Sequence, residues 1–209
     1  MQVATTPCVV KHLGRAEYLP IVAAMREFTE RRDAGTADEL WILEHPPVYT
    51  LGVGADPAHG PKDETRIPVL RCERGGDITY HGPGQVVLYA LLDLARRSIR
   101  VREFVSLLEQ SVIDLLAEHG VAAGRRSGAP GVYVAGAKVA ALGLRVSRGR
   151  CYHGVSLNVD MDLAPFAAID PCGFPGLRVT QTRALSIDAP PEVLGARLAA
   201  IVTRKLDDA

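Results

Sequence analysis

Apolar side chains recur with helical spacing in three separate parts of the chain. In residues 18–32, apolar residues fall at i, i+4 and i+7 on one face. Residues 101–119 carry the longest such stripe, and Gly120 follows it as a helix-ending residue. A last helix is predicted over residues 192–205. The helices are few and lie far apart in the sequence.

Short apolar runs between these helices predict β-strands. Residues 39–44 (ELWILE) form one run, which ends at a His-Pro-Pro sequence, and residues 48–51 follow it. Residues 85–94 (QVVLYALLDL) are rich in β-branched and aromatic side chains, as in a buried core strand. Residues 132–159 predict several strands, one of them turned back at residues 147–149. The fold class is therefore α/β or α+β.

Length and composition narrow the function classes. The chain has 209 residues, which predicts a single domain over 1–209, and 47% of them are apolar. Lys+Arg and Asp+Glu number 24 each, which argues against a general nucleic-acid binder. We see no signal peptide and no apolar run long enough to span a membrane. We therefore expect a cytoplasmic protein without nucleic-acid or membrane partners.

One of the four cysteines stands in an unusual setting. Cys8, Cys72 and Cys151 fit small buried side chains, and no pair forms a CxxC motif. Cys172 stands between proline and glycine in DPCGFPG, which predicts an accessible turn. A thiol with a pKa of about 8.5 needs a nearby cation to be reactive at neutral pH. Cys172 is thus the candidate nucleophile.

A glycine-rich segment, RGGDITYHGPGQ at residues 74–85, is the densest cluster of unusual residues. Its glycines allow the backbone to approach a ligand and cradle an oxyanion or a phosphate. The same residues fit a tight connection between a strand that ends at Thr79 and Tyr80 and one that starts at Gln85. From the residues alone, both interpretations stand.

Lys138 lies among small and apolar residues in GAKVAALG. A lysine in an apolar pocket can act as a base or bind an anion. Lysine is almost never buried without a partner, so the pattern favours the outer face of a strand. A Cys172–Lys138 dyad is compatible with the sequence but is not required by it.

Four motifs in order carry a resemblance to a known family. RGGDITYHGPGQ, GAKVAALG, HGVSLNV and DPCGFPG, together with WILEHPPVYTLG, resemble the lipoyl(octanoyl) transferases of lipoate biosynthesis across nearly the whole chain. We find no departure at the functional positions. The resemblance implies the α/β catalytic fold shared with biotin and lipoate protein ligases. It also implies an octanoyltransferase that takes its acyl group from octanoyl-acyl carrier protein. The acceptor would be a lysine on the lipoyl domains of 2-oxoacid dehydrogenases or on the glycine-cleavage H protein.

The resemblance also implies residue roles. Cys172 would carry the acyl group as a thioester, and Lys138 would lower its pKa. The substrate-binding positions would be Arg74, Gly75, Gly76, Asp77, Ile78, Thr79, Tyr80, His81, Ala141, Leu142, Gly143, Gly154, Val155 and Ser156. We expect no cofactor. We expect no metal either, because His81 and His153 lack further ligands at regular spacing.

Two other functions remain open from the sequence. An ATP-dependent lipoate or biotin ligase of the same fold would activate a free acid and need no cysteine. A non-catalytic module could instead bind carrier proteins or lipoyl domains. Exchange of one thioester for another is close to isoenergetic, and conversion to an amide runs downhill, so a cysteine relay needs neither ATP nor metal.

Two groups of arginines are candidates for docking an acidic carrier protein. The first clusters around the start of the helix at residues 101–119 and consists of Arg96, Arg97, Arg100 and Arg102. The second flanks the predicted turn at residues 147–149 and consists of Arg145, Arg148 and Arg150. The second is favoured, because its strand leads back towards Lys138.

Overall fold

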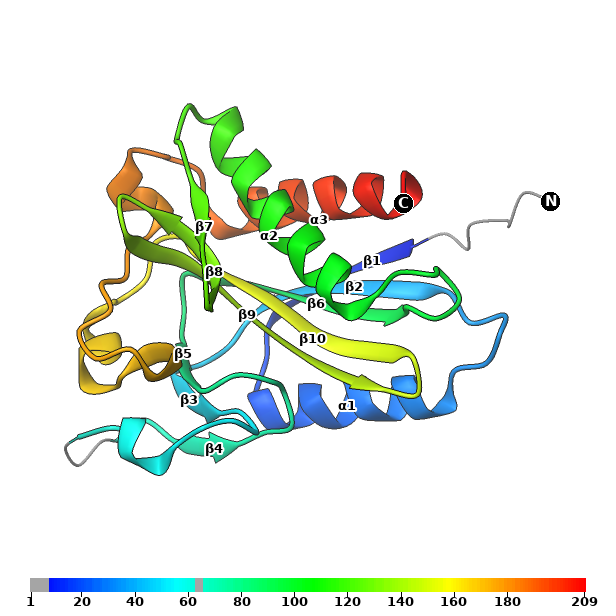
Figure 1. Ribbon diagram of the computed structural model, residues 1–209, viewed down its shortest axis with the longest axis horizontal. Coiled ribbons are helices and arrows are strands. Elements are labelled where there is room, and N and C mark those ends of the chain that lie inside the picture. The colour runs from blue at the N-terminus through cyan, green and yellow to red at the C-terminus, as the bar shows by residue number, and fades with distance from the viewer. Residues whose placement is uncertain (1–7, 63–65) are drawn as a thin grey trace.

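Two β-sheets and three α-helices make up the computed structural model, which describes residues 8–62 and 66–209 and, of Cys172, the backbone alone. The large sheet has seven strands in the order β1-β2-β6-β10-β9-β8-β7, and the small sheet has three in the order β4-β3-β5 (Figure 1). The helices are α1 (Tyr18–Arg31), α2 (Val101–Glu118) and α3 (Pro191–Asp207). The large-sheet strands are β1 (Cys8–Arg15), β2 (Asp38–Glu44), β6 (Gln85–Asp93), β7 (Gly124–Arg126), β8 (Ala129–Val134), β9 (Ala137–Ser147) and β10 (Arg150–Asn158). The small-sheet strands are β3 (Val48–Leu51), β4 (Val69–Arg71) and β5 (Ile78–His81).

The large sheet is buried on both faces, which explains the unbroken apolar run of β6. Because side chains alternate along a strand, Val86 and Leu88 face α2 and α3, whereas Val87 and Tyr89 face α1. Figure 1 shows α2 and α3 on one side of the sheet and α1 on the other. Burial on both faces provides the hydrophobic energy that holds these layers together.

The small sheet lies on the same side of the large sheet as α1 (Figure 1). Tyr49 of β3 and Tyr80 of β5 pack with Phe166 in a separate apolar cluster. The segment that connects β4 to β5 contains Arg74 and the two glycines that follow it. This arrangement places the first predicted binding segment opposite β9 and β10.

The α/β class is confirmed, and all three predicted helices are present. Their ends differ by a residue or two; for example, Arg32 and His119 are capping residues rather than helical ones. The predicted strands at residues 39–44, 48–51 and 85–94 correspond to β2, β3 and β6. Three strands, β1, β4 and β7, were not predicted. β4 and β7 have three residues each, and β1 is an edge strand with mostly exposed side chains, so none shows an apolar pattern.

Two other features are absent from the part of the chain that the structure describes. No helix in it is both long and apolar enough to cross a membrane. Within residues 8–62 and 66–209, no three His, Cys, Asp or Glu side chains come together as a metal site would require.

Candidate active site

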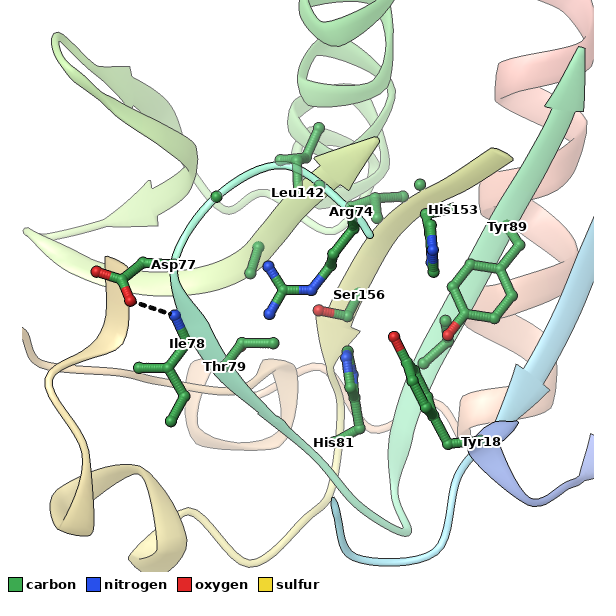
Figure 2. Close-up of a pocket in the computed structure, with 16 residues that line it drawn as sticks. Tyr18, Arg74, Asp77, Ile78, Thr79, His81, Tyr89, Leu142, His153 and Ser156 are labelled. Carbon is green, nitrogen blue, oxygen red and sulfur yellow. Dashed lines mark hydrogen bonds between the residues drawn. The ribbon is translucent and has the colours of Figure 1, made fainter. Parts of the chain in front are cut away.

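A cavity opens between the small sheet and the large sheet, beside the start of α1 (Figure 2). Its walls come from the segment after β4, from β5 and from the central strands β6, β9 and β10. The lining residues are Tyr18, Arg74, Gly76, Asp77, Ile78, Thr79, His81, Val87, Tyr89, Ala141, Leu142, Gly143, His153, Gly154, Val155 and Ser156. Most of the binding residues implied by the sequence resemblance therefore line one cavity.

Two of the three predicted binding segments pair directly with each other. In the antiparallel register of β9 and β10, Ala141 pairs with Ser156, and Gly143 pairs with Gly154. A Cβ atom at Gly154 would lie 2.2 Å from the carbonyl oxygen of Leu88, so no other residue fits there without a shift of β6. The wall of the cavity depends on this close approach.

The glycine segment docks on β9, beyond the end of its pairing with β8. The Gly75 N–H donates to the carbonyl oxygen of Leu144 at 2.8 Å. A Cβ at Gly143 would lie 2.9 Å from the Gly75 oxygen, and Gly76 has a φ of +88°. Glycine is therefore needed to bring this backbone against the strand. Because its N–H is already bonded, Gly75 cannot donate to a substrate oxyanion.

Arg74 holds the glycine segment to the small sheet. Its guanidinium donates to the Thr50 carbonyl oxygen at 2.6 Å and to the Thr50 hydroxyl at 2.8 Å. A further N–H donates to the carbonyl oxygen of Gly75 at 3.1 Å. The neighbouring carboxylate of Glu73 pairs with Arg26 instead. The cavity wall thus contains a buried cation held mainly by neutral oxygens.

Histidines and tyrosines close one end of the cavity. In Figure 2, Arg74 lies between Asp77 on one side and His153 and Tyr89 on the other, with Tyr18 and His81 nearby. The ring of Tyr18 stacks on that of His81, with centroids 6.2 Å apart. The ring of Tyr89 meets that of His153 edge-on, with centroids 5.5 Å apart. Tyr18, Val87, Tyr89 and His153 were not predicted as site residues.

The histidines at this end of the cavity are uncharged at neutral pH. Burial lowers the pKa of His45 to about 4 and those of His81 and His153 to about 3. His45 is hydrogen-bonded to Ala16 and Tyr89, whereas Nε2 of His153 has no partner among the described residues. His81 bonds Gln85 at 2.7 Å, which agrees with the predicted hydrogen-bonding role, although His81 lies in β5 and not in a loop.

The backbone of the Cys172 turn is fixed on both sides. The turn is a short 3₁₀ helix, Pro171–Gly173. Before it, the Asp170 N–H donates to the His59 carbonyl oxygen at 3.1 Å. At its end, Gly173 has a φ of +70°, and a Cβ there would lie 2.9 Å from the carboxylate of Asp77. The predicted turn is confirmed, and it borders the cavity at Asp77. The thiol of Cys172 is outside the described part of the chain.

The segment after the turn pairs with β9 at Lys138. The Lys138 N–H donates to the Arg178 carbonyl oxygen, and the Lys138 carbonyl oxygen accepts from the Thr180 N–H, both at 2.9 Å. These two bonds bring the strand of Lys138 and the segment that follows Cys172 side by side. A long stretch of sequence separates them, so no local motif could have predicted this pairing.

Lys138 is buried, so the outer-face interpretation is wrong. Its side chain is 3% exposed, and Nζ donates to the Pro130 carbonyl oxygen at 3.0 Å. The ammonium group also lies 5.3 Å from the centroid of the Tyr133 ring. A Cβ at Gly131 would lie 3.1 Å from Cε of Lys138, so the side chain fills its site closely. Lys138 itself is not among the residues that line the cavity.

Two other predicted binding residues lie outside the lining. Gly75 faces β9, as described above. Tyr80 packs on the other side of the small sheet, where its ring centroid is 5.5 Å from that of Phe166. Because side chains alternate along β5, Thr79 and His81 face the cavity and Tyr80 cannot.

The described cysteine thiols are poor nucleophiles or structural groups. Burial raises the pKa of Cys8 and of Cys151 to about 12. Cys72 donates its S–H to the Leu51 carbonyl oxygen at 3.2 Å. The predicted burial is confirmed for Cys151, whereas Cys8 and Cys72 are only partly buried.

Comparisons with known proteins decide the family. Residues 17–198 match the model of the lipoyl protein ligase A/B catalytic domain. An octanoyltransferase of Dechloromonas aromatica (strain RCB) is 58% identical over 201 residues, which cover 96% of this chain and 98% of that protein. The chain belongs to the octanoyltransferase family. As a member it is an acyltransferase, and the resemblance inferred from the four motifs is confirmed.

Solved structures relate the octanoyltransferase fold to that of the ligases. A crystal structure of lipoate-protein ligase A bound with ATP superposes with a TM-score of 0.80 at 14% identity, over 96% of this chain and 86% of that one. A biotin protein ligase from Aquifex aeolicus superposes with a TM-score of 0.55 at 12% identity, over 98% and 70% of the two chains. The shared ligase fold predicted from the motifs is confirmed.

The neutral histidines of this octanoyltransferase predict acid instability. Because their folded-state pKa values lie below the unfolded value of about 6.5, the unfolded chain binds more protons as the pH falls below that value. Stability should be highest above about pH 6.5 and fall towards pH 4. Each of the three histidines therefore contributes to the loss of stability as the pH falls below about 6.5.

The check is urea unfolding followed between pH 8 and pH 5. His153→Asn removes one titrating group and suits the φ of +65° found there, so it should reduce the dependence of stability on pH. His12→Asn, on the exposed strand β1, is the control and should leave the dependence unchanged. A wild-type stability that stays constant from pH 7 to pH 5 would contradict the assignment of neutral histidines.

Proposed function

We propose that the chain, acting as one catalytic domain over residues 1–209, moves an octanoyl group in two steps. The donor is octanoyl-acyl carrier protein, and Cys172 carries the group as a thioester. The acceptor is a lysine of a lipoyl domain in a 2-oxoacid dehydrogenase or of the glycine-cleavage H protein. Lys138 assists both steps. The setting is the cytoplasm, where acyl donor and lipoyl acceptor occur together.

One observation carries this proposal: the segment that follows Cys172 is hydrogen-bonded to β9 at Lys138, beside the cavity. Two backbone hydrogen bonds, one between Lys138 and Arg178 and one between Lys138 and Thr180, hold the segment that follows the turn against β9. The turn before this segment touches Asp77 of the cavity wall. The segments that contain the proposed nucleophile Cys172, the buried ammonium group of Lys138 and the wall of the apolar cavity are thus in contact with one another.

In the first step, the Cys172 thiolate attacks the thioester carbonyl carbon of the donor. A new C–S bond forms to Cys172 while the C–S bond to the carrier breaks, and the carrier leaves as a thiol after it receives a proton. In the second step, the acceptor amine attacks the acyl-enzyme. The C–N bond forms, the C–S bond to Cys172 breaks, and the amine proton returns to the thiolate. Lys138, as ammonium or amine, is the group proposed to hold and return these protons.

The cavity suits the acyl chain of such an intermediate. Val87, Ala141, Leu142 and Val155 contribute apolar surface, and the histidines at the far end are uncharged. Burial of each methylene is worth about 0.8 kcal/mol. A closed end formed by rings can favour a chain of a given length, although neighbouring lengths differ by only about 1–3 kcal/mol.

The test compares two donors for one acceptor. Octanoyl-carrier protein, mixed with enzyme and an unmodified lipoyl domain in the absence of ATP, should give an octanoylated lysine detected by mass spectrometry. Free octanoate with ATP and Mg²⁺ should give none. Transfer only from octanoate and ATP would make the chain a ligase, and transfer from neither donor would favour a non-catalytic binding module.

A further inference from the structure

Two exposed arginines lie beside the segment that follows the Cys172 turn. Arg126 ends β7, and its guanidinium carbon lies 5.1 Å from the ring centroid of Phe174, the residue that caps the turn. The carbonyl oxygen of Arg178 accepts a hydrogen bond from the backbone N–H of Lys138. The guanidinium of Arg178 donates to the Ala135 carbonyl oxygen at 3.0 Å. Both side chains are exposed. Two exposed positive charges therefore lie close to the segment that connects the Cys172 turn to Lys138.

The charges of these two arginines are not neutralised by ion pairs in the described residues. Neighbouring cations are neutralised: Arg125 pairs with Glu109 at 2.9 Å, and Lys62 pairs with Asp170 at 3.1 Å. For Arg126 and Arg178, the partners found in residues 8–62 and 66–209 are an aromatic ring and a carbonyl oxygen. These contacts hold each guanidinium in place while leaving N–H groups for a carboxylate.

The arginines favoured from the sequence lie at the other end of the sheet. β9 covers about 30 Å between Lys138 and Ser147, at about 3.3 Å per residue. Arg148 follows that far end. Arg150 lies 3.7 Å from the carboxylate of Asp93. A protein docked there would be about one strand length from the proposed nucleophile.

Two arginines of the other group are committed elsewhere. Arg96 and Arg97 bind the fully buried carboxylate of Asp38 at 2.8 and 2.6 Å and stabilise the end of β2. Arg100 pairs with Glu103 at 2.7 Å, and Arg102 is exposed near the start of α2. The hypothesis that either sequence-derived group docks the donor is therefore weaker than one based on the turn itself.

We infer that Arg126 and Arg178, beside the segment that follows the Cys172 turn, form the docking surface for an acidic acyl carrier protein. This inference rests on the proposed function, because it needs a protein-bound acyl donor. Carboxylates of the carrier bind the two guanidinium groups and bring the thioester to the neighbouring turn. Such charge pairing acts mainly on the association rate and weakens with salt, over a Debye length of about 8 Å at physiological ionic strength.

The experiment measures kcat/KM for three donors that differ in charge. Octanoyl-carrier protein has the acidic surface, octanoyl-coenzyme A has phosphates but no protein, and octanoyl-N-acetylcysteamine has neither. For the double variant Arg126→Glu with Arg178→Glu, kcat/KM for the carrier-bound donor should fall about tenfold or more and lose its salt dependence. Its kcat, and the rates with the two small donors, should stay close to wild type.

Two controls each reverse the charge of one arginine elsewhere on the surface. Arg148→Glu tests the hairpin surface, and Arg102→Glu changes an exposed arginine near the start of α2. Both should change kcat/KM for the carrier-bound donor by less than about twofold, in line with the small effect of isolated surface charges. A loss in Arg148→Glu that equals the loss in the double variant would move the docking surface to the hairpin.

Other outcomes would also overturn the inference. An equal loss with octanoyl-coenzyme A would make the arginines a phosphate site, and a loss with octanoyl-N-acetylcysteamine would mean damage to the turn. If the double variant matched wild type with the carrier-bound donor, the docking surface would be wrong while the proposed function stood. Failure of the wild-type enzyme with both carrier-bound and small donors would instead refute the proposed function.

Discussion

Replacement of Cys172 by serine should abolish octanoyl transfer, with kcat/KM lower by about three orders of magnitude or more. A serine hydroxyl is a far weaker nucleophile than a thiolate unless a strong base activates it. The turn should fold as before, because its shape depends on Pro171, on Gly173 at positive φ and on the hydrogen bond from Asp170 to His59. Steady-state transfer from octanoyl-carrier protein and the thermal unfolding midpoint measure the two expectations separately.

Cys72→Ser is the matched control for this variant. The Cys72 S–H donates to the Leu51 carbonyl oxygen, and a serine hydroxyl can make the same bond. We therefore expect this control to keep most of its activity. Wild-type turnover by Cys172→Ser, or an equal loss in Cys72→Ser, would refute Cys172 as the acyl-carrying residue.

The second large effect is expected at Lys138. Lys138→Met, which keeps most of the buried volume, should lower kcat by about 10²–10⁴-fold, the usual contribution of a positioned acid or base. If the ammonium group favours the thiolate, alkylation of Cys172 by iodoacetamide should also require a higher pH in this variant. Lys138→Arg should restore little, because arginine does not exchange protons.

Stability has to be measured beside these rates. Nζ of Lys138 is bonded to Pro130 and lies against the ring of Tyr133, so methionine loses a hydrogen bond while it keeps the apolar contacts. A small fall in the unfolding midpoint is expected in Lys138→Met. Alkylation profiles that match wild type in both variants would exclude the proposed effect of Lys138 on the thiol.

Some of the site follows from local sequence rules. A two-residue turn at Arg148 and Gly149, both at positive φ, pairs Ser147 with Arg150. Counting back along both strands then pairs Ala141 with Ser156 and aligns the two binding segments. The Cys172 turn is set in the same local way, by the proline before it and the glycine after it.

The rest of the site depends on contacts that no local pattern contains. Lys138 is in a segment that suits either face of a strand, and its neighbours include Pro130 and the segment at Arg178 and Thr180. Tyr89 is part of an apolar strand buried on both faces, so its periodicity does not distinguish a cavity wall from the core. His45 precedes two prolines, and this pattern predicts only the end of a strand. In the fold, however, Nε2 of His45 lies 2.8 Å from the Tyr89 hydroxyl and is hydrogen-bonded to it.

The central claim, an octanoyl thioester on Cys172, is tested most directly by intact mass spectrometry of the enzyme. The enzyme is mixed with octanoyl-carrier protein in the absence of ATP and acceptor, quenched in acid and then digested. The account predicts a gain of one octanoyl group, located on the peptide that contains Cys172, lost on treatment with hydroxylamine and absent from Cys172→Ser. An enzyme that transfers octanoyl to a lipoyl domain but never carries the group, or carries it on another residue, would contradict the account.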